Sequence, residues 1–157
     1  MAHYVPPGEG MVLELGPGAG AVTAALLRHG VHPRDLVLVE RSEAMCAVLA
    51  RRFPGVDLVR GDAANLVDVA APRKRHIRAI VSSLPLRSLP RPLVGRILEQ
   101  MALVSSPGTM LIQFSYALHG RSAAMAHGFE HARTEVIWRN VPPARVDALR
   151  YGGRRSD

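Results

Sequence analysis

The sequence predicts a single α/β domain in which helices cover both faces of an open and mostly parallel sheet. Short runs of valine, leucine and isoleucine alternate with longer helical patterns, and this alternation is typical of such a sheet. A glycine-rich turn at residues 16–20 joins the first run to the first helical pattern. The 157 residues suffice for one hydrophobic core, and no repeat or internal linker interrupts them.

The same pattern gives the order of the expected elements. Strands are expected at residues 12–15, 36–40, 56–60, 77–81 and 110–114, and helices at 19–29, 42–53, 66–70 and 93–104. Gly30 is suited to end the first helix and Ser42 to cap the second. Residues 117–131 are expected to be irregular and partly helical. Residues 134–139 and 145–149 are expected to form a hairpin around Val141-Pro142-Pro143. Strand order does not follow from the sequence.

Composition bounds the class of protein. The hydrophobic fraction of 48% and the charged fraction of 21% are globular values. No apolar run reaches the ~18–20 residues of a membrane-spanning helix. The N-terminal residues lack the apolar region of a secretory signal, and the single Cys46 excludes an internal disulfide. These features favour a cytoplasmic protein.

The charge indicates what kind of partner to expect. A net charge of +7 favours an anionic partner, either nucleic acid or an anionic membrane surface. Only seven residues are Phe, Tyr or Trp, which is few for a protein that stacks on single-stranded bases. A nucleic-acid partner is therefore the less favoured of the two.

The glycine-rich turn carries the clearest motif. Gly16, Pro17, Gly18 and Gly20 follow the first strand, and backbone N–H groups at the start of the next helix can face a ligand there. The spacing differs from the dinucleotide fingerprint, in which the third glycine lies one residue later. Glu14 would repel a pyrophosphate but suits a cationic ligand. The alternative is a tight turn that binds nothing.

Residues 11–21 resemble motif I of the class I S-adenosylmethionine-dependent methyltransferases, whose ligand carries an ammonium and a sulfonium. The resemblance implies a Rossmann-like fold with a seven-stranded, mostly parallel sheet and an antiparallel C-terminal hairpin. It also implies S-adenosylmethionine as cofactor, S-adenosylhomocysteine as product and no metal. The methyltransferases of this class usually have helices before the first strand, so residues 1–157 are expected to be one domain without those helices.

Ligands of parallel α/β sheets lie beyond the carboxyl ends of the strands, where two further acids are expected. Glu40 ends the second strand twenty residues after Gly20, the distance at which an acid holds ribose hydroxyls. Asp62-Ala63 after the third strand resembles the family's adenine-binding pair. Arg41 and Ser82, at the ends of the second and fourth strands, complete the expected cofactor site. The alternatives are a solvated acid at Glu40 and an ordinary turn residue at Asp62.

The acceptor site is expected after the fourth strand. Many amino-methyltransferases carry Asn/Asp-Pro-Pro-Tyr there, and the matching residues are Ser83-Leu84-Pro85-Leu86. A flipped adenine needs a polar partner for its edge and a ring to stack on, and this chain has neither at those positions. Leu84 and Leu86 instead predict an apolar mouth, with carbonyl groups available to an amine. A plain loop with buried leucines is the alternative.

Residues 80–90 and 111–116 resemble bacterial phospholipid N-methyltransferases, which are related to the ribosomal RNA adenine dimethylases. The resemblance covers residues 12–149, although the family's N-terminal membrane-binding segment has no counterpart here. It implies transfer of a methyl group to the amine of phosphatidylethanolamine, toward phosphatidylcholine, at the cytoplasmic face of an anionic membrane. An RNA adenine methyltransferase, a small-molecule methyltransferase and a non-catalytic cofactor-binding module stay open as alternatives.

Four side chains complete the expected acceptor site. Tyr116, at the end of the fifth strand, is expected to bind the amine and relay its proton, with His119 as the second candidate. Arg87 is the first candidate to hold a lipid phosphate, ahead of Arg91 and Arg121. The basic run at residues 73–78 precedes the fourth strand, so it should lie at the opposite edge of the sheet.

Overall fold

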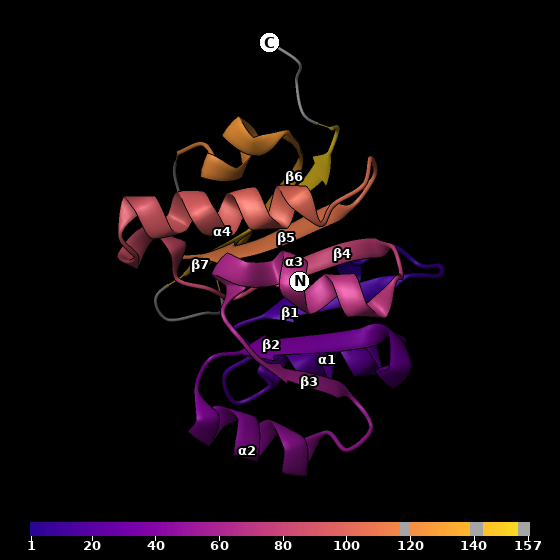
Figure 1. Cartoon of the computed structure of the whole chain (residues 1–157). Coiled ribbons are helices and arrows are strands. Elements are labelled where there is room, and N and C mark those ends of the chain that lie inside the picture. The colour runs from indigo at the N-terminus through magenta and orange to yellow at the C-terminus, as the bar shows by residue number, and fades with distance from the viewer. Residues whose placement is uncertain (117–119, 139–142, 154–157) are drawn as a thin grey trace.

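The computed structural model describes residues 1–116, 120–138 and 143–153. Seven strands form one sheet in the order β3-β2-β1-β4-β5-β7-β6 (Figure 1). Their bounds are β1 Met11–Leu15, β2 Leu36–Glu40, β3 Asp57–Arg60, β4 Ile77–Ser82, β5 Met110–Ser115, β6 Phe129–Ile137 and β7 Ala144–Tyr151. The first five strands are parallel, and β7 is antiparallel to both of its neighbours. The expected mixed sheet is thereby confirmed.

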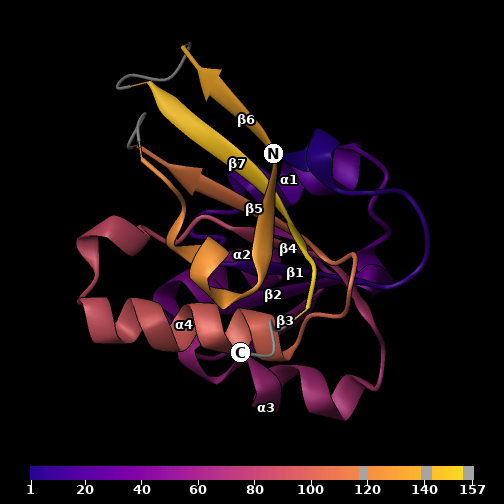
Figure 2. The ribbon, with the colours of Figure 1, turned by 90° about the horizontal axis from the view of Figure 1, so that it is seen from above.

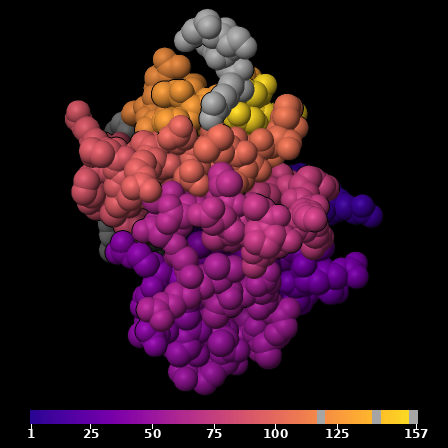
Figure 3. All heavy atoms as spheres, viewed as in Figure 1, coloured from indigo at the N-terminus to yellow at the C-terminus, as the bar shows by residue number. Residues whose placement is uncertain are grey.

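The strand order reverses between β1 and β4, which are neighbours although two strands separate them in the chain. Such a reversal opens a crevice beyond the carboxyl ends of the strands, because the following connections leave in opposite directions. In Figure 3 the N-terminal half of the chain forms one end of the visible face and the C-terminal half the other. The motifs of both halves therefore meet at the centre of the sheet.

Helices cover both faces of the sheet, as Figure 2 shows. One face packs against α3 (Leu66–Ala70) and α4 (Arg91–Leu103). The other packs against α1 (Ala21–Arg28) and α2 (Glu43–Arg52). All five residues of β1 are buried, as expected for a strand that is covered on both sides. No helix in the described part of the chain has the length and apolar character needed to cross a bilayer.

The elements of the parallel half lie within one or two residues of the expected bounds. Ser42 caps α2 by accepting a hydrogen bond from the Met45 N–H, and Gly30 follows α1 with φ of 93°. The helix expected from residue 19 begins at Ala21, because Gly20 takes a left-handed conformation that interrupts it. The expected partial helix after β5 is the 3-10 helix η6 (Ala123–His127).

The predicted start of the C-terminal hairpin is wrong. The strand expected from residue 134 begins at Phe129, which is buried and lies 5.1 Å from the Tyr151 ring between centroids. Residues 130–135 are exposed because β6 is an edge strand, so its polar side chains hide the strand pattern. The register also shifts between His131 and Arg133, which breaks the alternation further. Of the turn expected at Val141-Pro142-Pro143, residues 141–142 lie outside the described residues.

Candidate active site

The glycine-rich turn is a cradle that is open on one side. Gly16, Gly18 and Gly20 have φ angles of 66°, 55° and 83°, a region that most side chains disfavour. A Cβ atom on Gly16 would come within 2.7 Å of Leu84 Cδ2, whereas a Cβ atom on Gly18 would meet nothing within 4 Å. The Pro17 carbonyl accepts a hydrogen bond from the Gly20 N–H at 2.8 Å and closes the turn. The backbone at Gly18 is thus accessible to a ligand.

Glu14 is a fully buried acid beneath this turn. Both of its carboxylate oxygens, and the hydroxyl of Thr23 on α1, are buried without a hydrogen-bond partner in the described structure. Burial raises the pKa of Glu14 to about 7. Thr23 opposes this rise in pKa, although its hydroxyl does not reach hydrogen-bond geometry with the carboxylate. An unpaired buried acid is unfavourable by itself, and a nearby cation would stabilise its charged form.

Glu40 is oriented by two backbone donors. Its Oε1 accepts from the Ser42 N–H at 2.8 Å, and its Oε2 accepts from the Gly18 N–H at 3.3 Å. The carboxylate therefore connects the end of β2 to the glycine turn that follows β1. Each oxygen keeps a further acceptor site, so the group is pre-oriented for hydroxyl donors.

Asp62 both caps a turn and faces solvent. Its Oδ1 accepts from the Ala64 N–H at 2.9 Å and caps the 3-10 helix η3 (Ala63–Asn65). Its Oδ2 lies 3.9 Å from the exposed Arg41 guanidinium, a distance at which the attraction is weak. Ala63 is buried. This geometry agrees with the ordinary turn residue, and the predicted adenine contacts of Asp62 and Ala63 stay predictions.

The loop after β4 is fixed to the core by backbone hydrogen bonds. The Ser83 N–H donates to the Leu15 carbonyl at 3.0 Å, and the Leu84 N–H lies 3.4 Å from the buried Ser82 hydroxyl. Pro85 is exposed and precedes the 3-10 helix η5 (Leu86–Ser88). The side chains of Leu84 and Leu86 pack partly against the core beside α4. Leu84 is the leucine next to the glycine turn, because its Cδ2 lies 2.7 Å from where a Cβ atom of Gly16 would be.

Gln113 on β5 is a site residue that the sequence analysis missed. Its Nε2 donates to the carbonyls of Leu84 at 3.2 Å and Phe114 at 2.7 Å, while its Oε1 is buried without a described partner. The Leu84 carbonyl also accepts from the Leu86 N–H at 2.9 Å, so it is already satisfied and is no acceptor for an amine. A glutamine inside an apolar strand was the available signal, because buried polar groups need a structural reason.

The side chains expected at the acceptor site are spread along the rim of the same edge. Tyr116 is exposed and its ring contacts Phe114 edge to face, with 5.0 Å between centroids. Arg87 is exposed and its guanidinium lies next to Gly120. Arg91 at the start of α4 and Arg121 before η6 are also exposed. His119 lies outside the described residues. The structure brings Tyr116 and Arg87 to one edge but shows no direct contact between them.

Comparison with known proteins identifies the family. Residues 12–108 match the family model described as "Methyltransferase domain". The chain is a class I S-adenosylmethionine-dependent methyltransferase. The crystal structure of the N-methyltransferase NodS from Bradyrhizobium japonicum WM9, in complex with S-adenosylhomocysteine, has the same fold, with a TM-score of 0.71 and 15% identity over 90% of this chain and 78% of that one. Magnesium protoporphyrin IX methyltransferase from Synechocystis PCC 6803, with bound S-adenosylmethionine, gives a TM-score of 0.69. Its sequence is 17% identical over 93% of this chain and 71% of that one.

Curated relatives of this methyltransferase carry the name "Ribosomal RNA small subunit methyltransferase A". The protein from Synechococcus sp. (strain JA-3-3Ab) is 35% identical over 119 residues, which is 72% of this chain and 37% of that protein. The protein from Chelativorans sp. (strain BNC1) is 31% identical over 145 residues, which is 84% of this chain and 52% of that protein. The chain thus spans about a third to a half of the length of these relatives.

The residues of this methyltransferase fit its cofactor, S-adenosylmethionine. Among the described residues the buried carboxylate of Glu14 has no hydrogen-bond partner, the turn is open at Gly18, and Glu40 has two oriented oxygens for hydroxyl groups. A carboxylate can accept two hydroxyl donors at once, which suits a ribose. All three features lie at the carboxyl ends of adjacent strands.

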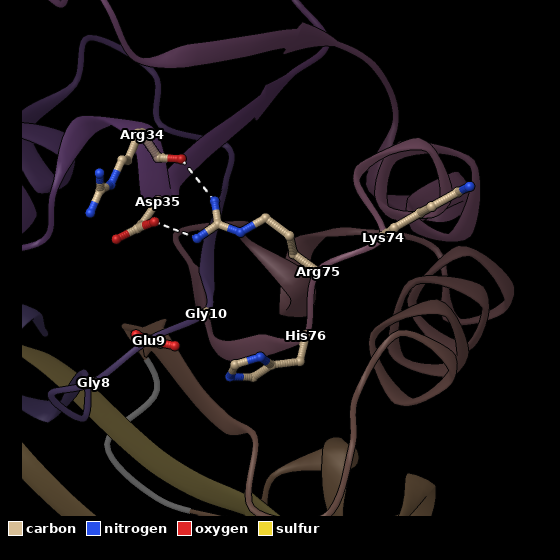
Figure 4. A pocket seen from close by; sticks show the side chains of 8 residues that line it. All are labelled: Gly8, Glu9, Gly10, Arg34, Asp35, Lys74, Arg75 and His76. Carbon is tan, nitrogen blue, oxygen red and sulfur yellow. Dashed lines mark hydrogen bonds and ion pairs between the residues drawn. The ribbon is translucent and has the colours of Figure 1, made fainter.

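A polar pocket of about 670 Å³ lies at the opposite edge of the methyltransferase sheet (Figure 4). It is lined by segments that precede β1, β2 and β4, among them Asp35, Arg75 and His76. Arg75 pairs with Asp35 at 2.5 Å and donates to the Arg34 carbonyl at 3.1 Å. The basic run therefore lies away from the glycine turn, as expected, and part of its charge is neutralised within the chain.

Proposed function

We propose that this methyltransferase transfers a methyl group to the amine of phosphatidylethanolamine, toward phosphatidylcholine. The observation that carries the proposal is the acceptor loop, where Ser83 and Leu86 stand at the positions of the amide and the aromatic ring of adenine methyltransferases. Leu84 and Leu86 give the loop an apolar side, and the exposed Arg87 follows directly. An apolar mouth with a cation at its rim suits a lipid that carries an amine and a phosphate.

S-adenosylmethionine, held by residues such as Glu14, Gly18 and Glu40, would supply an electrophilic methyl group for transfer to the amine nitrogen. A primary amine has a pKa of about 10, so only about one in a thousand is neutral at pH 7, a cost of about 4 kcal/mol. The chain must therefore bind the neutral amine and accept its proton. Tyr116 lies after β5 on the same edge and is exposed to solvent, which suits binding of the amine and relay of its proton to water.

Adenine in ribosomal RNA is the second candidate acceptor. The names of the curated relatives favour it, and these relatives align with up to 84% of the chain. By similarity alone, this candidate has the stronger support. The side chains of the acceptor loop oppose it, because the loop offers no amide at Ser83 and no ring at Leu86 for a flipped base. In this proposal the loop would lie next to the reacting amine, so its lack of an amide and a ring favours the lipid.

One labelling experiment separates the two acceptors. The purified chain is incubated with methyl-labelled S-adenosylmethionine and either mixed micelles of phosphatidylethanolamine and phosphatidylglycerol or unmethylated small-subunit ribosomal RNA. We expect label in the lipid fraction. Micelles of N-acylated phosphatidylethanolamine are the matched control, because their nitrogen is not nucleophilic, and they should stay unlabelled. Label in the RNA alone would overturn the proposal in favour of adenine. Cofactor binding without transfer to either would indicate a non-catalytic module.

A further inference from the structure

Two large side chains at the active-site edge are unusually exposed. Trp138 is 73% exposed and Tyr116 is 61% exposed, more than any other large hydrophobic side chain in the described structure. Trp138 directly follows β6, and Tyr116 directly follows β5. Aromatic rings of this size are normally covered, because each buries a large area when it packs. Their exposure therefore indicates a surface that a partner would cover.

The register of the sheet places the two rings on one edge. Ser115 on β5 and Val136 on β6 both pair with Arg145 of the intervening β7. Tyr116 and Trp138 follow these two residues by one and two positions, and β5 and β6 are about 10 Å apart across β7. The arrowheads of β5 and β6 point to the same side of the molecule in Figure 2. Because β1 and β4 also end at this edge, the aromatic rim, Tyr116 and Trp138, lies on the same edge as the glycine turn.

Positive charge accompanies the aromatic rim. Arg87 and Arg121 are exposed, and Arg87 approaches Gly120, the residue before Arg121. Neither arginine takes part in an ion pair among the residues that the structure describes. Cations of this kind attract the anionic headgroups of a membrane surface. This edge of the sheet thus carries the exposed rings of the aromatic rim together with two arginines that have no ion-pair partner among the described residues.

We propose that the aromatic rim docks on the interfacial layer of an anionic lipid bilayer, with Arg87 and Arg121 contacting the headgroups. Tryptophan and tyrosine favour this layer because their rings are apolar while their N–H and O–H groups stay hydrated. A bilayer in this position would present amines to the loop of Leu84 and Leu86, so the inference rests on the proposed lipid acceptor. Stacking of RNA bases on the rings is the competing outcome, and the leucines beside the rim favour the bilayer.

Trp138 is the single tryptophan of the chain, so its fluorescence reports on the rim directly. The intact chain is titrated with vesicles of phosphatidylglycerol and phosphatidylethanolamine, with vesicles of phosphatidylcholine alone, and with single-stranded RNA. We expect the emission to shift to shorter wavelength and to resist acrylamide quenching with the anionic vesicles. The response should weaken at high salt, because the arginine contacts are screened.

Two single variants test whether Trp138 makes the contact with the bilayer. Trp138→Ala should weaken co-sedimentation with anionic vesicles about tenfold or more, because the ring loses its burial in the interface. Leu103→Ala is the matched control, since Leu103 is 46% exposed at the end of α4, on the edge away from the glycine turn. It should bind as the wild type does. Trp138→Ala should also keep its activity on monomeric short-chain phosphatidylethanolamine, which needs no bilayer.

Each outcome decides the docking proposal separately from the function. Unchanged emission with anionic vesicles, or equal sedimentation of Trp138→Ala and wild type, overturns the docking surface even where micellar lipid is methylated. An emission change with RNA and none with vesicles overturns it in favour of base stacking. Docking through Trp138 without any lipid methylation supports the surface and contradicts the proposed acceptor.

Discussion

The Glu40 carboxylate accepts a hydrogen bond from the backbone N–H of Gly18 at 3.3 Å, across the boundary between β2 and the glycine turn. A second donor, the Ser42 N–H, holds the other carboxylate oxygen at 2.8 Å. Two of the sequence-predicted cofactor residues therefore contact each other in the folded chain. The orientation of Glu40 is set before a ligand arrives, which reduces the entropy lost on binding.

Replacement of Glu40 should weaken cofactor binding. Glu40→Ala removes both acceptor oxygens, and charged hydrogen bonds of this kind contribute enough that we expect a loss of about ten- to a hundredfold in affinity. Calorimetric titration with S-adenosylhomocysteine measures this loss of affinity. Glu43→Ala is the control, because Glu43 is exposed and pairs with Arg60 outside the turn. Equal affinities of the two variants would exclude the ribose contact.

Glu14 should make the free protein less stable as the pH rises. Its pKa is about 7 in the folded state against 4.5 for an ordinary glutamate, so between these pH values the unfolded chain loses the proton and the folded chain keeps it. Ionisation thus favours the unfolded state, and each pKa unit is worth about 1.4 kcal/mol, which gives a penalty of about 3 kcal/mol above pH 7. Below pH 4.5 both states are protonated and the penalty vanishes.

Urea unfolding at pH 5 and pH 8 tests this linkage. Glu14→Gln cannot ionise, so the difference in unfolding free energy between the variant and the wild type should grow in favour of the variant from pH 5 to pH 8. Bound S-adenosylmethionine should reduce the difference, because its ammonium would favour the ionised carboxylate. A pH-independent difference would mean that Glu14 titrates normally.

Tyr116→Phe should lower turnover without altering cofactor affinity. The variant keeps the ring against Phe114 and loses only the hydroxyl that would hold the amine and pass on its proton. Groups that assist proton transfer contribute strongly, and we expect kcat to fall about 10- to 100-fold. Steady-state kinetics on micellar lipid gives kcat, and calorimetry with S-adenosylhomocysteine gives the cofactor affinity. Wild-type turnover would remove Tyr116 from the chemistry.

Gln113→Met should separate loop positioning from cofactor binding. The change keeps the side-chain volume but removes the donor to the Leu84 carbonyl, so the acceptor loop loses one of its ties to β5. We expect kcat to fall about fivefold, since one neutral hydrogen bond is worth about 1 kcal/mol, while the affinity for S-adenosylhomocysteine stays unchanged. Loss of cofactor affinity in parallel with turnover would point to general disruption instead.

The buried pair of Arg145 and Asp147 should dominate the stability of the C-terminal strands. Arg145 donates to both carboxylate oxygens at 2.7 Å and also to the Gly120 carbonyl. Asp147→Ala leaves a buried guanidinium without its partner and should cost about 3–5 kcal/mol in unfolding free energy. The double variant Arg145→Met/Asp147→Leu should lose less, because no charge stays buried. Urea unfolding measures the loss of unfolding free energy in both variants. A larger loss in the double variant than in Asp147→Ala would contradict the prediction.

Prediction succeeded where burial on both faces produces a plain pattern. β1 and β2 are apolar over most of their length and almost fully buried, so the pattern predicts where these strands end and places Glu14, Gly18 and Glu40 at one edge of the sheet. It failed at β6, because an edge strand exposes polar side chains such as Glu130 and Arg133 and carries a register shift. Gln113 was missed because its hydrogen bond to Leu84 reaches a loop 29 residues away in the chain.

The sequence by itself determined the fold class, the glycine turn and the acids that follow the strands, since these depend on local periodicity and on the chain positions where strands end. Only the tertiary structure decided the strand order, the tie between Gln113 and Leu84, and the common edge of Tyr116 and Trp138. Each of these depends on contacts between segments far apart in the chain. Such contacts are selected by the packing of the whole sheet, which no local stretch of sequence encodes.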